Sequence, residues 1–449
     1  MKPKYTMDLT EGSVVKQLLL FALPILATNI LQHLYNAADV MVVGKFATET
    51  ALAAVGSTGS LTVLVTTLFT SLAIGTNVSC ANHFGARRQE NLRKSMHTSM
   101  ILGLVSGILL MLIGMVFARP LLEMMGSPEN VIDQATLYMR IIFCGIPASM
   151  LYNFASAILR AHGDTKRPMI ILSICGLVNV GLNLVFVIFL SMDVAGVALA
   201  TIISQYLSMA VALYLLFDKK GECAMTMQEM HPDWQSAKEI ISVGIPSGIN
   251  GIAFSLSNVI LQSTINSFGD IAMAGEAAAS SIAGFVYWIP AAFGTASVSF
   301  TGQCCGARKY DRVDKLLWYG IGFSCLGVAL TSVAFTIFAP ELIGCYSDHP
   351  EVITMGAQKL ILISWSYLIF PLGEVGLNCL RGLGHSAIPT VMNVGGICAT
   401  RLLWIFFVFP LYPTLLMLNV CFPVSWAISG LLQMWYYYRC RKHLQLQHA

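Results

Sequence analysis

Long apolar stretches follow one another along almost the whole 449-residue chain. Each is longer than the roughly 18 residues that a helix needs to cross the hydrocarbon of a bilayer. They fall at about 17–43, 51–83, 93–118, 133–159, 168–190, 193–217, 237–267, 273–304, 314–338, 353–380, 387–410 and 412–437. The pattern predicts an all-α integral membrane protein with twelve transmembrane helices. The first stretch is too long for a signal peptide and is interpreted as the first of these helices.

The amino-acid composition argues against several classes of protein. Only 11% of residues are charged, against about 25% in soluble domains, and the net charge of +3 gives no indication of nucleic-acid binding. Twelve cysteines are scattered through the apolar stretches, and the pair Cys304-Cys305 has no second pair at metal-ligand spacing. We therefore expect no metal site, no structural disulfide and no nucleic-acid partner.

Basic residues gather in alternate connections. Of the 26 Lys and Arg, 21 lie at the chain ends or in every second loop, and the other loops hold little beyond Lys45 and Arg119. Cytoplasmic loops of membrane proteins carry such an excess. We expect a multi-pass protein of the cell membrane with both termini in the cytoplasm.

The chain repeats itself. An offset of 221 residues superimposes Gly, Arg and Pro residues of separate loops, and an offset of 222 places Pro24 on Pro246. The matching pairs include Gly85-Ala86-Arg87 with Gly306-Ala307-Arg308, Leu159-Arg160 with Leu380-Arg381, Gly163 with Gly384, and Pro168 with Pro389. The repeat predicts two parallel six-helix bundles around a central cavity, at 1–217 and 237–449, joined by a polar cytoplasmic linker at 218–236. Such a duplication favours a transporter that works by alternating access.

Polar side chains cluster on the first apolar stretch. A carboxylate inside a membrane is costly, so Asp39 is a functional candidate. Residues three or four apart share one face of a helix, and that face holds Gln32, Tyr35, Asn36 and Asp39. Asn179 and Asn183 lie one turn apart on the fifth stretch, and the sixth offers Thr201, Ser204 and Gln205. These oxygen ligands suit a proton or Na⁺, although amides can also simply hold helices together.

Two other acidic residues lie in the predicted spans, and the sequence leaves the role of one of them, Glu374, open. Glu374 could face the cavity and attract cations, or it could form a structural ion pair with Arg401 on the next helix. Glu276 lies near the outer end of its stretch, where we expect it to be solvated.

Several motifs, in order, give the chain a resemblance to the multidrug and toxic compound extrusion family of transporters over about residues 10–437. They are Leu23-Pro24, the run Ala38-Asp39-Val40-Met41-Val42-Val43-Gly44, Gly85-Ala86-Arg87, Leu159-Arg160-Ala161-His162-Gly163-Asp164 with Pro168, and Leu380-Arg381-Gly382-Leu383-Gly384 with Pro389. The resemblance implies export of organic, often cationic, compounds in exchange for H⁺ or Na⁺.

The resemblance also implies a set of ion-coupling residues. Members with a site in the first half use an Asp on helix 1, an Asn and an Asp on helix 5 and a Thr on helix 6, which match Asp39, Asn179, Asn183 and Thr201. The second acid is thus an amide here, so Asp39 is left to titrate alone. Members with a site in the second half carry a Glu where this chain has Phe254, and Glu374 does not match their second acid.

The sequence thus favours an ion-coupled antiporter that exports organic, cationic or amphipathic compounds. The expected substrate cavity holds Gln32, Tyr35, Asn36, Gln205, Asn258, Gln262 and Glu374. The alternative is a lipid-linked saccharide flippase of related architecture, which would need more basic cavity residues. An enzyme is not expected, because the spans hold no His-rich metal set and no Ser–His or Ser–Lys pair. The expected partners are small organic molecules and membrane lipids, with no cofactor besides the coupling ion and a monomeric state.

Overall fold

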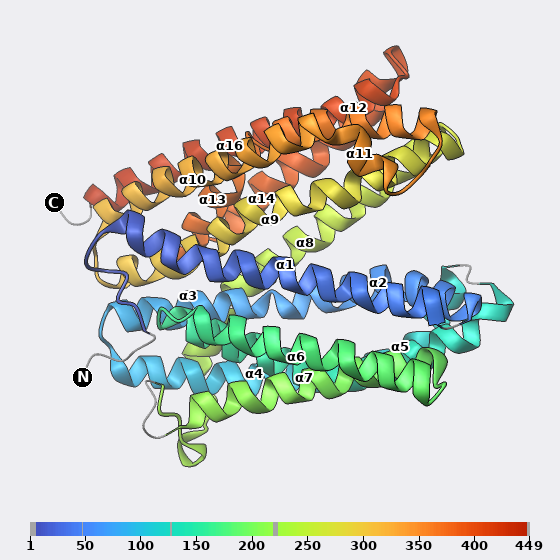
Figure 1. Ribbon diagram of the computed structural model, residues 1–449. Coiled ribbons are helices and arrows are strands. Elements are labelled where there is room, and N and C mark those ends of the chain that lie inside the picture. The colour runs from blue at the N-terminus through green and yellow to red at the C-terminus, as the bar shows by residue number, and fades with distance from the viewer. Residues whose placement is uncertain (1–5, 47, 126–127, 219–222, 447–449) are drawn as a thin grey trace. The chain divides into compact units, whose positions relative to one another are not determined.

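The computed structural model describes residues 6–46, 48–125, 128–218 and 223–446, and these residues form helices and no strands. The chain runs through α1 (Val14–Phe46), α2 (Glu49–Thr70), α3 (Leu72–Gly85), α4 (Gln89–Met124), α5 (Glu129–Ala161), α6 (Lys166–Leu184), η1 (Val185–Phe189), α7 (Asp193–Phe217), η2 (Met227–Glu229), α8 (Trp234–Asn266), α9 (Asp270–Gly306), α10 (Tyr310–Ile337), α11 (Ala339–Gly344), α12 (Pro350–Ser366), α13 (Phe370–Gly382), α14 (Ala387–Asn393), η3 (Val394–Ala399), α15 (Thr400–Leu403), η4 (Trp404–Val408), η5 (Phe409–Leu411) and α16 (Leu415–Leu446). Figure 1 shows their order along the chain.

The predicted transmembrane helices are confirmed. In the described part of the chain, eleven spans are long and apolar enough to cross a bilayer, and α12 with α13 forms a twelfth that is bent by 46°. The bend falls just before Pro371, whose ring removes a backbone donor from the helix. The second predicted stretch consists of two helices, α2 and α3, which meet at Ser71 within one span. A proline inside an apolar stretch predicts a kink, so the bend at Pro371 could be expected from the sequence, whereas the break at Ser71 could not.

The described residues divide into two compact units, and two helices belong in part to each. The first unit comprises Ala27–Gly248 with the short segment ending at Leu9, and the second comprises Thr10–Leu26 with the residues from Ile249 onward. The unit boundary thus lies inside α8 rather than in the polar stretch at 218–236, of which residues 219–222 lie outside the description. The helix α8 is continuous from Trp234. Its first half, up to Gly248, belongs to the first unit, and its second half belongs to the second unit.

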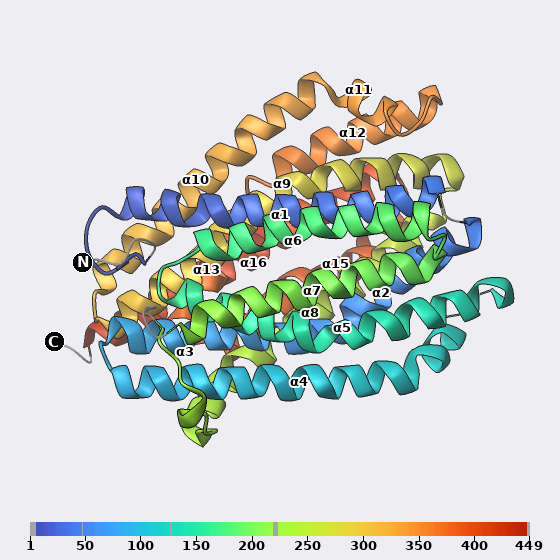
Figure 2. The same ribbon diagram turned by 60° about the horizontal axis from the view of Figure 1, so that its bottom comes forward.

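Close helix crossings build the first unit. Gly107 on α4 leaves only 2.7 Å between an added Cβ and the Pro147 Cα of α5, and Gly114 is covered by the Phe143 ring. Small residues allow such contacts where no hydrophobic effect drives helices together in lipid. In Figures 1 and 2, α4, α5 and α7 accordingly run alongside one another. This packing provides the rigid support for the polar side chains described below.

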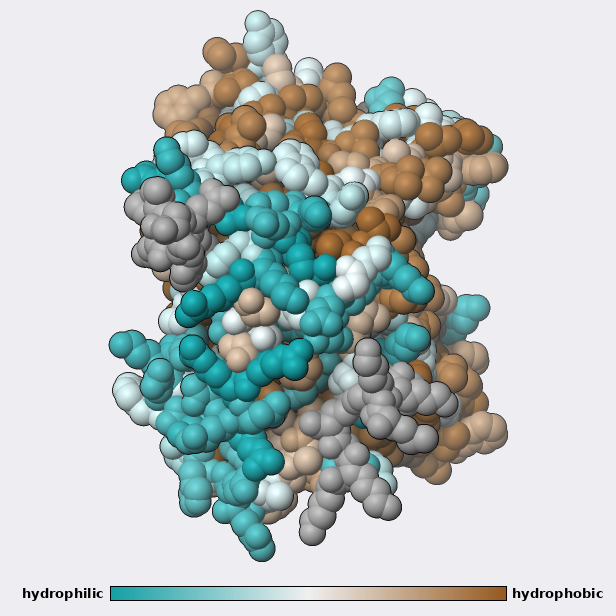
Figure 3. All heavy atoms as spheres, turned by 90° about the vertical axis from the view of Figure 1, so that its left-hand side faces the viewer, coloured by the Kyte–Doolittle hydropathy of each residue, from teal (hydrophilic) through white to brown (hydrophobic). Residues whose placement is uncertain are grey.

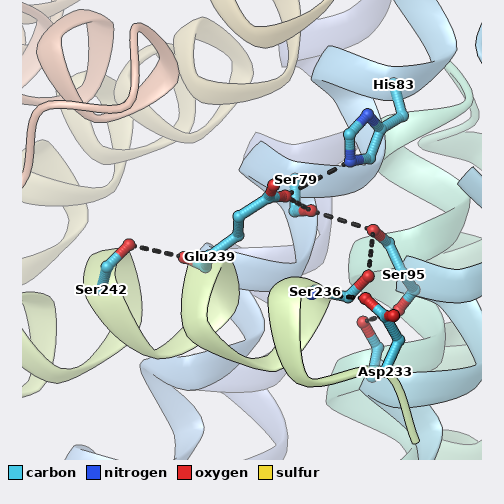
Figure 4. Close-up of polar contacts among 8 residues, drawn as sticks. Ser79, His83, Ser95, Asp233, Ser236, Glu239 and Ser242 are labelled. Carbon is cyan, nitrogen blue, oxygen red and sulfur yellow. Dashed lines mark hydrogen bonds and ion pairs between the residues drawn. The ribbon is translucent and has the colours of Figure 1, made fainter. Parts of the chain in front are cut away.

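The first half of α8 is fixed to α3 by packing and by polar contacts. An added Cβ on Gly75 would lie 2.0 Å from the Ile240 carbonyl oxygen, so the two helices touch backbone to backbone. Beside this crossing, the Glu239 carboxylate accepts a hydrogen bond from Ser79 Oγ at 2.9 Å and lies 3.3 Å from His83 Nε2 (Figure 4). Asp233 Oδ2 accepts the backbone N–H of Ser236 at 2.8 Å and so caps the start of α8.

The first half of α1 is held in the second unit by two basic side chains of α10 and the turn before it. Arg312 donates to the Gly12 carbonyl at 2.8 Å and to Gln17 Oε1 at 2.9 Å, and Lys309 Nζ donates to the Thr10 carbonyl at 3.0 Å. These bonds place Thr10–Leu26 with the second unit although it precedes the first in sequence.

The internal repeat extends to unusual backbone conformations. Arg87 and Arg308, which the offset of 221 pairs, have φ values of 55° and 58°, and Gly163 and Gly384 both have φ of 87°. A non-glycine residue rarely adopts this left-handed conformation, so the shared value shows the same turn in both halves. The two parallel six-helix bundles are thereby confirmed.

Hydrophilic side chains gather on the end of the first unit that carries the α3–α4 turn (Figure 3).

One sequence expectation about a charged residue is wrong. Glu276 is not solvated, because it is 2% exposed and forms an ion pair with Lys359 on α12. Asn419 Nδ2 also donates to Glu276 Oε1 at 2.7 Å, and Lys359 Nζ donates to Ser280 Oγ at 2.8 Å. The network ties α9, α12 and α16 together inside the second unit, where a lone buried charge would be strongly unfavourable.

Candidate functional site

Asp39 lies in the C-terminal half of α1, where its carboxylate meets α6. Asn183 Nδ2 donates a hydrogen bond to Asp39 Oδ1. Asn183 is fully buried, and its own Oδ1 has no hydrogen-bond partner. A buried acceptor without a donor is uncommon in proteins and calls for an explanation. The pair therefore combines a carboxylate inside a membrane span with an unused oxygen beside it.

Asn179 and Thr201 extend this pair toward α7. Asn183 Nδ2 lies 3.4 Å from Asn179 Oδ1, and Asn179 Nδ2 lies 3.4 Å from Thr201 Oγ1. Thr201 Oγ1 donates in turn to the Val197 carbonyl at 2.9 Å. The structure thus brings Asp39, Asn179, Asn183 and Thr201 together as one chain of polar contacts across α1, α6 and α7.

Tyr35 and Gly176 set the distance between α1 and α6. An added Cβ on Gly176 would lie 1.9 Å from Tyr35 Cε2, so the ring lies flat against the glycine. The hydroxyl of Tyr35 also donates to the Ser173 carbonyl at 3.0 Å. Tyr35 precedes Asp39 by one turn, and Gly176 precedes Asn183 by about two turns on the same face. Packing at Gly176 therefore positions the carboxylate against its amide partner.

A π-helical turn follows the site directly. The α6 helix ends at Leu184 and passes into η1, whose five residues include the buried Val187. Such turns interrupt the regular pattern of hydrogen bonds and occur often at functional sites. Asn183 thus lies where the helix changes its winding.

The geometry suits binding and release of a proton. A side-chain amide that rotates by 180° exchanges its nitrogen and its oxygen. In the present arrangement the Asn183 amide donates to a charged Asp39, and after rotation its oxygen can accept a proton carried by Asp39. The four oxygen-bearing side chains could also surround a hard monovalent cation, but a single carboxylate supplies only one negative charge.

Three other first-unit residues are predicted to line the substrate cavity. Gln32 and Asn36 are exposed on α1. Gln205 is packed between α7 and α5, because an added Cβ on Gly145 would lie 2.4 Å from its Oε1. The structure therefore assigns Gln205 a place in a helix contact, whereas a cavity role of the exposed Gln32 and Asn36 stays a prediction.

A second polar location lies in the second unit, where a pocket of about 120 Å³ has room for several water molecules. Its lining consists of Asn250, Gly251, Phe254, Tyr287, Phe370, Gly373, Glu374, Asn393, Ile397, Trp426 and Ser429. Glu374 Oε1 accepts a hydrogen bond from Asn378 Nδ2 at 2.8 Å, and Asn378 Oδ1 accepts one from Arg381 at 3.2 Å. Of the two readings of Glu374, the structure supports the one in which it faces a cavity.

Arg401 is not the partner of Glu374. Its guanidinium donates to Asn258 Oδ1 at 2.9 Å and lies over the rings of Phe254 and Phe422. The sequence prediction placed Asn258 in the cavity together with Gln262. Gln262 is exposed and donates to Asn266 on its own helix at 2.9 Å.

Sequence reasoning missed Lys359 and the aromatic walls of the pocket. Lys359 is the only lysine inside the stretch at 353–380, which was a usable sign of a partner for Glu276. Tyr287 and Trp426 gave no comparable signal, because most aromatic residues of a membrane protein face lipid or its interface.

Comparisons with known proteins agree with this architecture. The sequence profile of the MatE family matches residues 24–185 and 246–407. The chain is 27% identical over 445 residues to the probable multidrug resistance protein YoeA of Bacillus subtilis, which covers 97% of this chain and 96% of that protein. It is 24% identical over 392 residues to the probable multidrug resistance protein NorM of Thermotoga maritima, with 86% and 84% covered.

A solved structure shows the same fold. It is described as the outward-facing conformation of a multidrug resistance MATE family transporter of the MOP superfamily. The TM-score is 0.91 at 22% identity, with 99% of this chain and 100% of that chain covered. This likeness extends over the helices that carry Asp39 and over those that line the second-unit pocket.

Proposed function

The chain belongs to the MatE family of multidrug and toxic compound extrusion transporters, and on that premise we propose that it is a proton-coupled antiporter with Asp39 as the coupling acid. The observation that carries the proposal is the contact between Asp39 and Asn183, whose own oxygen is buried without a partner. Family membership makes the chain an embedded membrane transporter. The coupling ion and the exported compound are the parts proposed here.

Antiport requires that ion and substrate favour different states of the protein. With Asp39 charged, the Asn183 amide donates to it and holds α1 against α6. When a proton binds, the amide rotates, the carboxyl becomes a donor, and the charge that opposed a fully closed apolar contact is removed. Proton binding from outside and release to the cytoplasm then alternate with substrate export. Na⁺ is the alternative coupling ion, supported by the oxygen atoms of Asn179 and Thr201.

The expected substrates are organic cations with apolar rings. The pocket of the second unit supports this class, because Glu374 offers a carboxylate among Phe254, Tyr287 and Trp426. Aromatic faces attract organic cations beyond their hydrophobic contribution. We expect small organic molecules as partners, lipids around the spans, a monomer, and no cofactor other than the coupling ion.

The basic loops support a cell-membrane protein with cytoplasmic termini. Flipping of a lipid-linked saccharide is not favoured, because the matched relatives bear the names of multidrug resistance proteins.

Liposomes that contain the purified protein and a fluorescent organic cation test the coupling. A pH gradient and a Na⁺ gradient are imposed separately on wild type, Asp39→Asn and Asp133→Asn. The control Asp133 is an exposed acid that pairs with Arg119. Dye movement driven by the pH gradient, lost in Asp39→Asn and kept in Asp133→Asn, is the expected result. Movement driven only by Na⁺ would replace the proton with Na⁺, and equal movement in all three proteins would exclude Asp39 as the coupling acid.

A further inference from the structure

Arg401 is a buried cation without an anionic partner. Its side chain is 0% exposed, and among the described residues no carboxylate lies within 4.0 Å of its guanidinium. Its hydrogen bonds go to Asn258 Oδ1 at 2.9 Å and Ser425 Oγ at 3.4 Å, and its Nη2 has no partner. An arginine buried inside a membrane protein normally pairs with an acid or lines a path for substrate.

Arg401 and two of its contact residues, Asn258 and Phe422, each lie one helical turn from a residue that lines the second-unit pocket. These three residues lie on three separate helical segments. Phe254 lines the pocket and is followed four residues later by Asn258, and Ile397 is followed four residues later by Arg401. On α16, which runs in the opposite direction, Trp426 lines the pocket and Phe422 lies four residues before it. Phe422 holds the guanidinium at 4.6 Å from its ring centre.

The opposite side of the same wall is polar and linked by hydrogen bonds. Asn393 lies one turn before Ile397, its Nδ2 donates to Asn250 Oδ1 at 2.8 Å, and its Oδ1 accepts a hydrogen bond from Ser429 at 2.6 Å. An added Cβ on Gly373, the neighbour of Glu374, would lie 3.6 Å from Ser429 Oγ. Glu374 lines the pocket together with Asn393 and Ser429 and so belongs to this polar layer.

Three layers thus follow one another along these helices. The first holds Glu374 with its amides, the second holds the aromatic residues, and the third holds Arg401. Arg401 follows Asn393 by eight residues, or about 12 Å along a helix. Glu374 therefore lines the pocket itself, whereas the Arg401 guanidinium lies behind its aromatic wall, covered by the rings of Phe254 and Phe422. Part of the span between them is π-helical, a winding that recurs at functional sites.

We propose that Arg401 is an anion-binding subsite that takes the carboxylate of a zwitterionic aromatic compound whose amine lies at Glu374. The inference rests on the proposed function, because it uses the same pocket for substrate. In the structure the Phe254 ring covers the guanidinium at 5.2 Å. On binding, this ring turns aside and the carboxylate replaces it as the partner of Nη2. Guanidinium groups bind carboxylates through paired N–H donors, which suits this role.

A pair of dyes with one ring system and different charge tests the subsite. Rhodamine B carries a free carboxylate and is zwitterionic, whereas its ethyl ester is a cation. The dissociation constants of both dyes are measured by fluorescence polarisation for wild type, Arg401→Gln, Arg401→Lys and Arg140→Gln. Arg140 is an exposed arginine of α5 and serves as the control. Thermal unfolding of each variant is recorded alongside.

The expected result is a loss of about tenfold or more in the affinity of Arg401→Gln for the zwitterion, with the affinity for the ester unchanged. Arg401→Lys should recover part of the loss, and Arg140→Gln should bind both dyes as wild type does. An equal loss for both dyes in Arg401→Gln would show a purely structural role and overturn the proposal. Unchanged zwitterion binding in that variant, or failure of wild type to bind the zwitterion, would overturn it as well.

Failure of the proposed function gives a different result. If wild type neither binds nor transports the ester but binds the zwitterion through Arg401, cation export is wrong and the anion subsite stands. If the ester is transported in exchange for protons while Arg401 does not affect zwitterion binding, cation export stands and the subsite is wrong.

Discussion

Pro24 on α1 and Pro246 on α8 occupy equivalent positions of the repeat, 222 residues apart, and each precedes by two residues the point where its helix passes from one unit to the other. A proline inside a helix removes one backbone hydrogen bond and favours a kink. Among the described helices, only α1 and α8 belong in part to both units. We therefore expect that a bend at either proline accompanies transport.

Replacing either proline with alanine is expected to slow transport while leaving the fold intact. Alanine is favoured over proline inside a helix by about 3 kcal/mol, so Pro24→Ala and Pro246→Ala should stiffen α1 and α8. We expect the rate of dye export to fall by roughly an order of magnitude, because hinge residues control such steps. Pro423→Ala is the matched control, since Pro423 lies inside α16 within the second unit. An equally slow Pro423→Ala would remove the special role of the hinge pair.

Gly176 is expected to tolerate no larger side chain. The methyl group of Gly176→Ala would overlap the Tyr35 ring, and overpacking of this kind typically costs about 1–3 kcal/mol. The variant should unfold at a lower temperature and lose gradient-driven transport, because Asp39 is moved away from Asn183. Tyr35→Ala should relieve the overlap, so the double variant is expected to be more stable than the sum of the single changes predicts. Strict additivity would contradict the contact.

Glu239 is expected to stabilise the attachment of α8 to α3. In Glu239→Ala, His83 loses this partner while Ser79 keeps Ser95 Oγ at 3.1 Å (Figure 4), so we expect a cost of about 1–3 kcal/mol. Hydrogen exchange should then speed up in the first turns of α8. Ser242→Ala is the control, because the exposed Ser242 hydroxyl bonds only to the backbone of its own helix. Equal exchange rates in both variants would argue against the attachment.

Because His162 is buried, we expect the protein to lose stability at acidic pH. Its ring lies beside Phe84, its Nδ1 is 2.8 Å from the Ile158 carbonyl oxygen, and burial lowers the pKa of the imidazole. The unfolded chain therefore takes up a proton at about pH 6.5, while the folded protein does so only at lower pH. Stability contributed by this group is complete above that value and declines below it, by at most about 1.4 kcal/mol per pH unit.

The measurement is the thermal unfolding midpoint of the purified protein over a series of acidic to neutral pH values. His162→Gln should show a weaker decline toward acid than wild type, whereas the exposed His231→Asn should match wild type. An unchanged slope in His162→Gln would show that other groups set the acid sensitivity.

The sequence predicted the spans because hydrocarbon thickness fixes the length of an apolar stretch. It predicted the repeat because Gly, Arg and Pro in loops, such as Gly163 and Gly384, do not match by chance. It did not predict that the unit boundary lies within α1 and α8, since apolar residues along these helices are alike on both sides of Pro24 and Pro246. Contacts between distant segments, such as Gly75 with Ile240, decide that boundary.

For the site, the chain order of polar residues was informative where a resemblance aligned them. Asp39 and Asn183 could be named in advance and lie in contact. Glu276 was misjudged because its partner Lys359 is 83 residues away in sequence. Whether Gln205 faces a cavity or a neighbouring helix depends on the rotation of its helix about its own axis. Apolar periodicity does not fix that rotation in lipid, where most faces of a helix are hydrophobic.

Proton release on substrate binding tests most directly whether Asp39 is the coupling acid. An organic cation is added to purified protein in weakly buffered detergent, and the pH change is recorded for wild type, Asp39→Asn and Glu374→Gln. In an antiporter, substrate and proton weaken each other's binding to the same degree. We expect proton release from wild type and from any Glu374→Gln protein that still binds the cation, and none from Asp39→Asn. Release from Asp39→Asn equal to that of wild type, or no release from wild type despite binding, would contradict the assignment of Asp39 as the proton-coupling acid.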